Sequence, residues 1–146
     1  MRLKLVSIGR ERADPTAPLV ADYVARIRRF LPIDSVVLKP EREDRLAARV
    51  LKEQGKGRRL VALDDGGEQP SSRGLAKIVG SWMDQGLNQV TLVIGGADGL
   101  PAEVRDKADQ LLSLSELTLP HRLARLVLAE QLYRALSIIR NVPYDK

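Results

Sequence analysis

The sequence predicts an α/β fold with a mostly parallel sheet and helices on both of its faces. Strand-like and helix-like segments alternate from one end of the 146-residue chain to the other, and Val90–Ile94 is a nearly continuous apolar run rich in β-branched residues. Repeated strand–helix–strand order is typical of parallel strands whose connecting helices pack on the sheet. A strand that is apolar on both sides indicates that both faces are covered. The length fits a single domain, residues 1–146.

The first half of the chain contains five of these segments. Arg2–Ile8 is predicted to be a strand because leucine and isoleucine recur there among few polar residues. Leu19–Phe30 is predicted to be a helix with one apolar stripe, and Ser35–Leu38 is a short apolar run between prolines, which is typical of a strand. Asp44–Gln54 has helical spacing and is ended by glycines. Leu60–Leu63 is a third strand, closed by an Asp-Asp-Gly-Gly run.

The second half continues the alternation. Ser72–Gln85 is predicted to be a helix because a glycine stands just past its last apolar residue. Val90–Ile94 is the fourth strand, and the next helix begins at Pro101 because proline favours the first helical position. Leu114–Leu119 is predicted to be a fifth strand. A long helix from Arg122 to Arg140 then leads to the C-terminal tail.

Composition excludes several classes of protein. The chain has no cysteine and one histidine, which removes disulfides, thiolate nucleophiles and a histidine-rich metal site. Aromatic residues make up 3% of the chain, which argues against a binding face of stacked rings. No signal peptide and no apolar run of membrane-spanning length is visible. We therefore expect a soluble, cytoplasmic protein that does not enter a membrane.

The charge is distributed unevenly. Residues 1–60 carry 15 basic and 8 acidic side chains, whereas residues 61–146 carry 9 and 11. Seventeen of the 24 basic residues are arginines, the type that binds phosphate through two hydrogen bonds. The basic half could be a landing surface for nucleic acid or a solvated face with local ion pairs, and the charge pattern alone leaves both open.

The last helix has more apolar residues than one stripe can hold. A helix on the surface of a domain needs a single apolar face, so a second face indicates burial against something else. A second copy of the chain, forming an isologous dimer, would cover it. A central core helix in a monomer is the alternative.

Two loops and the tail are candidates for binding chemistry. The glycine-rich turn Gly95–Gly99 follows a buried strand, where open sheets bind ligands, but it could be a plain tight turn. It lacks the spacing of a dinucleotide or P-loop fingerprint. His121 ends the second loop, Leu114–His121, and could bind a ligand or only cap or pack against the following helix. From the residues alone, the tail with Tyr144 and Asp145 is expected to fray rather than to close a pocket.

Three separated segments together resemble the ribosomal large-subunit methyltransferase H family of SPOUT methyltransferases. The spacing between them matches the family, and Met1–Gly9 and Leu60–Asp64 also fit, so the resemblance extends over essentially the whole chain. The segments are Val93–Leu100, Leu112–His121, and Ala129–Ala135 with the Pro143-Tyr144 ending.

The resemblance implies a SPOUT fold with a deep C-terminal trefoil knot, a homodimer, and S-adenosylmethionine as cofactor. It implies methylation of N3 of a pseudouridine in helix 69 of 23S rRNA on assembled ribosomes. The basic stretch with Arg26, Arg28 and Arg29 becomes a candidate rRNA surface. The cofactor contacts implied are Leu63, Gly95, Leu114, Ser115, Glu116, Leu117, Thr118 and Leu119.

Tyr144 and Asp145 are the implied catalytic residues, and one of them departs from the family. The family typically ends Pro-Tyr-His followed by Arg or Lys, whereas this chain has Asp145 after Tyr144. Methyl transfer to N3 requires loss of its proton, and a carboxylate is a weaker base than an imidazole. The leading hypothesis is an active methyltransferase. The alternatives are a non-catalytic ribosome-binding or assembly factor that keeps the fold, and a small-molecule α/β enzyme that does not depend on ribosomes.

Overall fold

The structure, a computed structural model, describes residues 1–9 and 13–144. Strands and helices alternate along these residues, as the sequence predicts. The elements are β1 (Arg2–Ile8), α1 (Ala17–Ile27), β2 (Ile33–Leu38), α2 (Glu43–Gln54), β3 (Arg59–Glu68), α3 (Ser72–Asp84), β4 (Gln89–Ile94), α4 (Ala102–Lys107), β5 (Gln110–Leu112) and α5 (His121–Ile139). Within the described residues, no helix is both long enough and apolar enough to cross a membrane.

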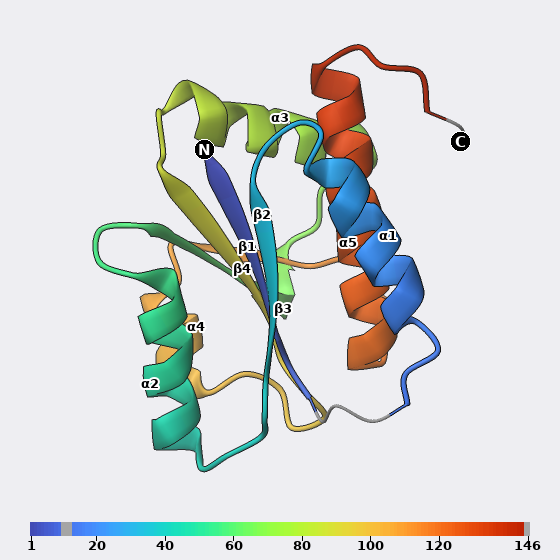
Figure 1. Ribbon diagram of the computed structural model, residues 1–146. Coiled ribbons are helices and arrows are strands. Elements are labelled where there is room, and N and C mark those ends of the chain that lie inside the picture. Colours follow the sequence, from blue (N-terminus) through green and yellow to red (C-terminus); the bar gives the residue numbers. More distant parts are fainter. Residues whose placement is uncertain (10–12, 145–146) are drawn as a thin grey trace.

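The strands form one parallel sheet in the order β2-β1-β4-β3-β5 (Figure 1). Helices α1, α3 and α5 cover one face, and α2 and α4 cover the other. β4 lies at the centre and is buried at all of its positions. The predicted three-layer α/β architecture is therefore confirmed.

Alternate residues of the central strands pack against the two helix layers, one on each face of the sheet. Leu3 and Leu5 of β1 pack against the layer of α1, α3 and α5, and Val6 and Ile8 pack against the layer of α2 and α4. This follows from the two-residue period of a strand, which sends successive side chains to opposite faces. The sheet edge at the carboxyl ends of the strands is thereby held rigidly from both sides.

The prediction of a strand at Leu114–Leu119 is wrong. The fifth strand is the shorter segment β5, which pairs with Val61–Leu63 of β3, and residues 114–119 form a loop. The side chains of Ser113 and Ser115 hydrogen-bond to backbone groups within the loop, which competes with strand pairing. β3 itself extends beyond the predicted Leu63 and bulges before Glu68 pairs with Leu112.

The long helix α5 is in large part a core helix. Its buried residues face α1, α3 and the sheet: Leu128, Ala129, Leu132, Ala135, Leu136 and Ser137. Leu123 and Ile138 nevertheless remain exposed, at 44% and 38%. Many of the apolar side chains of α5 are thus covered by α1 and α3, and some of them remain at the surface.

Trp82 anchors the start of β5, and its replacement should be costly. Its side chain is fully buried, and its indole Nε1 donates a hydrogen bond of 2.8 Å to Gln110 Oε1. Trp82→Phe removes this bond and leaves unfilled volume, so we expect a loss of about 2 kcal/mol in the free energy of unfolding. Leu19→Ala, at a side chain that is 52% exposed, should cost less than about 0.5 kcal/mol. Urea denaturation measures both values, and equal effects would contradict this role.

Candidate functional site

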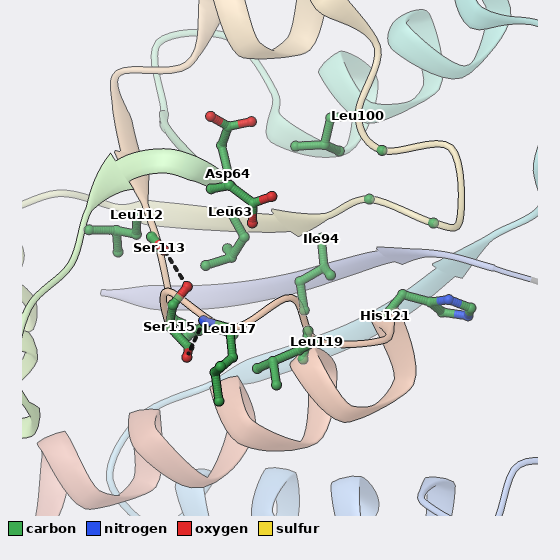
Figure 2. A pocket seen from close by; sticks show the side chains of 16 residues that line it. Leu63, Asp64, Ile94, Leu100, Leu112, Ser113, Ser115, Leu117, Leu119 and His121 are labelled. Atoms are coloured by element: carbon green, nitrogen blue, oxygen red, sulfur yellow. Dashed lines mark hydrogen bonds between the residues drawn. The ribbon is translucent and has the colours of Figure 1, made fainter.

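A pocket lies at the carboxyl ends of β3, β4 and β5, where the loops after these strands meet the start of α5 (Figure 2). Loops at this edge of a parallel sheet are the usual place for ligand binding. The residues that line the pocket are Leu63, Asp64, Asp65, Ile94, Gly95, Gly96, Gly99, Leu100, Leu112, Ser113, Leu114, Ser115, Leu117, Leu119, His121 and Ala124.

The glycine-rich turn is both a tight turn and a wall of this pocket. Gly99 N donates a hydrogen bond of 3.0 Å to Gly96 O, and Gly99 has a φ of 77°, which glycine adopts without strain. At Gly95 a Cβ atom would lie 2.6 Å from the carbonyl carbon of Gly99. Glycine is needed at this position because the turn folds back onto its own backbone.

The loop between β5 and α5 forms the opposite wall. Ser113 N donates to Glu68 O at 2.7 Å, and Ser113 Oγ donates to Ser115 O at 3.1 Å. Leu117 N donates to Ser115 Oγ at 2.9 Å (Figure 2). These bonds fix an irregular backbone that leaves the Leu117 side chain 74% exposed.

Six of the eight predicted cofactor residues line this pocket together: Leu63, Gly95, Leu114, Ser115, Leu117 and Leu119. Glu116 and Thr118 are exposed and do not belong to the set. Sequence reasoning did not place Asp64 or Asp65 in the site, although both directly follow the apolar part of β3, the position at which strand ends deliver polar groups. His121, for which capping or packing was the alternative, lines the pocket, and its ring also lies against Gly9.

The chemistry of the lining favours a ligand that is partly apolar and not highly anionic. Leucine and isoleucine side chains supply an apolar floor, and Asp64 and Asp65 add two carboxylates. Among the described lining residues there is no lysine or arginine. A polyphosphate would meet uncompensated negative charge here, whereas a positively charged group beside an apolar one is well accommodated.

The prediction that the C-terminal tail frays is wrong for the part of the tail that the structure describes, which ends at Tyr144. The Tyr144 hydroxyl donates to Glu130 Oε2 at 2.8 Å and lies 3.3 Å from the Tyr23 hydroxyl. Its ring packs edge-on against Tyr133 and under the guanidinium of Arg134, at centroid distances of 4.7 and 4.6 Å. Asp145 lies outside the described residues.

Tyr144 does not reach the pocket of its own chain. It contacts α5 at Glu130, nine residues after His121, which is roughly 14 Å along the helix axis. Burial raises the pKa of the Tyr144 hydroxyl well above its ordinary value, with further contributions from the hydrogen bonds to Tyr23 and Glu130. The hydroxyl therefore stays protonated at neutral pH and acts as a donor, not as a base.

A family model described as "Predicted SPOUT methyltransferase" matches residues 1–145. The chain belongs to the SPOUT methyltransferase family. It is 42% identical over 154 residues to the ribosomal RNA large subunit methyltransferase H of Anaeromyxobacter sp. (strain Fw109-5), with 100% of both chains covered. It is 42% identical over 155 residues to the protein of the same name from Dechloromonas aromatica (strain RCB), covering 100% of this chain and 99% of the relative. A solved structure of a probable methylase family protein from Haemophilus influenzae Rd KW20 has a similar fold, with a TM-score of 0.57 at 10% identity, covering 99% of this chain and 70% of that one.

As a SPOUT methyltransferase, the protein uses S-adenosylmethionine as methyl donor. The residues of the pocket fit this cofactor, because the sulfonium and ammonium groups of the donor are positive and its adenine is flat and largely apolar. Asp64 and Asp65 suit the charges, and the leucine side chains with the glycine turn suit the ring.

Proposed function

We propose that this protein methylates N3 of a pseudouridine in helix 69 of 23S rRNA, on assembled ribosomes. The observation that carries the proposal is the pocket at the carboxyl ends of β3, β4 and β5, with its glycine turn and its carboxylates. Full-length relatives at 42% identity bear the name of a large-subunit rRNA methyltransferase, which supports rRNA as the substrate. The enzyme works in the cytoplasm, where ribosomes are assembled.

The cofactor is held by the two walls of the pocket. Leu63, Leu114 and Leu119 provide apolar contacts, the Gly95 turn presents close backbone, and the loop with Ser115 and Leu117 closes over them. Glu116 and Thr118 contribute through their backbone, since their side chains are exposed. When bound, S-adenosylmethionine supplies an electrophilic methyl group. The chain's own part is to exclude water, orient the acceptor and remove a proton.

A homodimer completes the site. Leu117, Leu123 and Ile138 leave an exposed apolar surface beside the pocket and along α5. Tyr144, one of the two proposed catalytic residues, docks on the same helix and is too far from its own pocket to act there. A second copy packed on α5 would bring its tail to the pocket, with Tyr144 as a hydrogen-bond donor. The single domain of residues 1–146 and the deep trefoil knot are part of the same proposal.

The rRNA surface is the exposed side of α1 and its C-terminal end. Arg28 and Arg29 are exposed, and Arg26 lies over the rings of Tyr23 and Tyr133 at 5.4 and 5.7 Å. Arginines so placed bind phosphates and position the enzyme on a folded RNA, while the assembled ribosome supplies most of the specificity.

One observation supports a second candidate function. Asp145 stands where the family has histidine, so a non-catalytic ribosome-binding or assembly factor with the same fold is the alternative. The two candidate functions differ in whether the protein transfers a methyl group. A factor would bind ribosomes and leave their methylation unchanged, whereas an enzyme transfers the methyl group of labelled S-adenosylmethionine to 23S rRNA.

Mass spectrometry of 23S rRNA from a strain that lacks the protein tests the proposal. We expect the mass of one methyl group to disappear from the helix 69 fragment and to return when the wild-type gene is restored. The control is the same strain restored with a Gly95→Ala gene, which should regain less of the methyl group than the wild-type gene restores. A fragment that stays methylated in the deletion strain would contradict the proposed function.

A further inference from the structure

A second pocket adjoins the cofactor pocket at the Gly95–Leu100 turn. Its walls come from the end of β1, the loop after β2 with Glu41, the turn after β4 with Asp98, and Arg122 at the start of α5. Four residues line both pockets: Gly96, Gly99, Leu100 and His121. The two pockets are thus neighbours that meet at these residues.

The second pocket lies where the order of the strands reverses. β1 and β4 are adjacent in the sheet, yet the helices that follow them, α1 and α4, cover opposite faces. Open parallel sheets bind ligands at such a point, beside the carboxyl ends of the two strands. Gly9 continues β1 into this pocket and is fixed there by its N–H, which donates to Leu38 O at 3.0 Å.

His121, the single histidine of the chain, lines both pockets. Its ring points away from Ser115 and Leu117 (Figure 2) and packs against Gly9, where an added Cβ would lie 3.1 Å from Nε2. The side chain is half-buried. Within the described part of the chain no side-chain partner occupies its ring nitrogens, so they are available to a bound ligand.

The charges around the second pocket select a neutral ligand. Among the described residues, Glu41, Glu43 and Asp98 line it beside one cation, Arg122. A phosphate would be repelled by the carboxylates, whereas the N–H and C=O groups of an uncharged nucleobase can pair with both kinds of side chain. Ile8, Pro40, Leu46 and Pro101 offer apolar contact to the base.

We propose that this second pocket receives the target pseudouridine base and that His121 accepts its N3 proton. The inference rests on the proposed function. As the bond from N3 to the methyl carbon forms and the sulfonium S–C bond breaks, the N3 proton passes to a ring nitrogen of His121. The neutral imidazole becomes an imidazolium, the donor loses its positive charge, and the base remains neutral. The proton acceptor is thus His121 rather than Asp145, and the loss of the family's terminal histidine is compatible with activity.

Arg122, the residue after His121, forms an ion pair with Asp14. Arg122 Nε lies 3.8 Å from Asp14 Oδ2, and Asp14 also accepts hydrogen bonds from Thr16 N and Oγ1. The hydrogen bond from Thr16 is the main reason that the pKa of Asp14 is lowered, so its negative charge beside Arg122 persists into acid. The other charged groups that line the two pockets, within residues 1–9 and 13–144, are Glu41, Glu43, Asp64, Asp65 and Asp98.

His121→Gln tests the role of the imidazole. With ribosomes from the deletion strain as acceptor, we expect turnover to fall about a hundredfold, while calorimetry finds the affinity for S-adenosylhomocysteine unchanged within about threefold. Gly9→Ala places a methyl group against the ring without removing the imidazole, and it should lower turnover about tenfold. Glu103→Gln on α4 is the matched surface control.

Three results would overturn the inference. One is a His121→Gln enzyme with nearly normal turnover, or one whose lost turnover follows a comparable loss of cofactor affinity. Another is a large loss of turnover in the Asp145→Asn variant together with normal turnover in the His121→Gln variant. The third is carbethoxylation of His121 that excess ribosomes with S-adenosylhomocysteine do not slow, since the bound base should shield the ring. An inactive wild-type protein would instead overturn the proposed function itself.

Discussion

Replacing Gly95 with alanine is expected to weaken the binding of S-adenosylhomocysteine about thirtyfold. A Cβ at this position would lie 2.6 Å from Gly99 C and 2.8 Å from Leu100 N. Both are backbone atoms of the turn that lines both pockets, so the turn itself must move. Overpacking of this kind costs about 1–3 kcal/mol, and 2 kcal/mol of distortion in the bound state corresponds to about thirtyfold in Kd. Isothermal titration calorimetry measures the affinity directly.

The matched control for Gly95→Ala is Gly80→Ala. Gly80 lies within α3, where an added Cβ would touch only Ile139 Cδ1, at 3.9 Å. Alanine should stabilise that helix by about 0.5–1 kcal/mol and leave the affinity unchanged. If Gly95→Ala binds as tightly as Gly80→Ala, the turn does not hold the cofactor.

Glu130→Gln is expected to release the C-terminal tail from α5. One carboxylate oxygen, Oε2, accepts hydrogen bonds from Arg134 Nε and Nη2 and from the Tyr144 hydroxyl. Both ionic partners are about one fifth exposed, so the loss is smaller than for a fully buried pair. We expect about 1–2 kcal/mol less free energy of unfolding and about tenfold faster backbone exchange around Tyr144, measured by hydrogen–deuterium exchange.

Glu103→Gln provides the comparison for Glu130→Gln. Glu103 pairs with Lys107 at the same four-residue spacing, but both side chains are more than half exposed. Such a pair contributes about 0.3–0.5 kcal/mol, and its loss should leave the tail unchanged. Equal exchange at Tyr144 in the two variants would show that Glu130 does not hold the tail.

The sheet and its helices follow from local patterns in the sequence. Val90–Ile94 reads as a buried strand because its burial on both faces leaves an apolar run. The strand β5 could not be read in this way, since Gln110–Leu112 is too short to display a period. Leu114–Leu119 contains three leucines and reads as a weak strand, but serine hydroxyls bind the loop's own backbone, and the apolar pattern does not reveal this competition.

The two loops that line the pocket were predictable as candidates from the residues, whereas the individual cofactor contacts came only from the family resemblance. Leu63, Gly95 and Leu119 are far apart in the chain, and the parallel sheet brings them to one edge. The position of His121 depends on a contact with Gly9, more than a hundred residues earlier. The docking of Tyr144 depends on Tyr23 and Glu130. Such contacts arise from the tertiary fold, so neither composition nor spacing could have predicted them.

A crystal structure of the protein with S-adenosylhomocysteine tests the central claim most directly. We predict density for the ligand between the Gly95–Leu100 turn and the Ser113–Leu119 loop, with its amino group near Asp64 or Asp65 and the second pocket open beside it. Density for the ligand elsewhere, or none at a saturating concentration, would contradict the assignment of this pocket as the methyl-donor site.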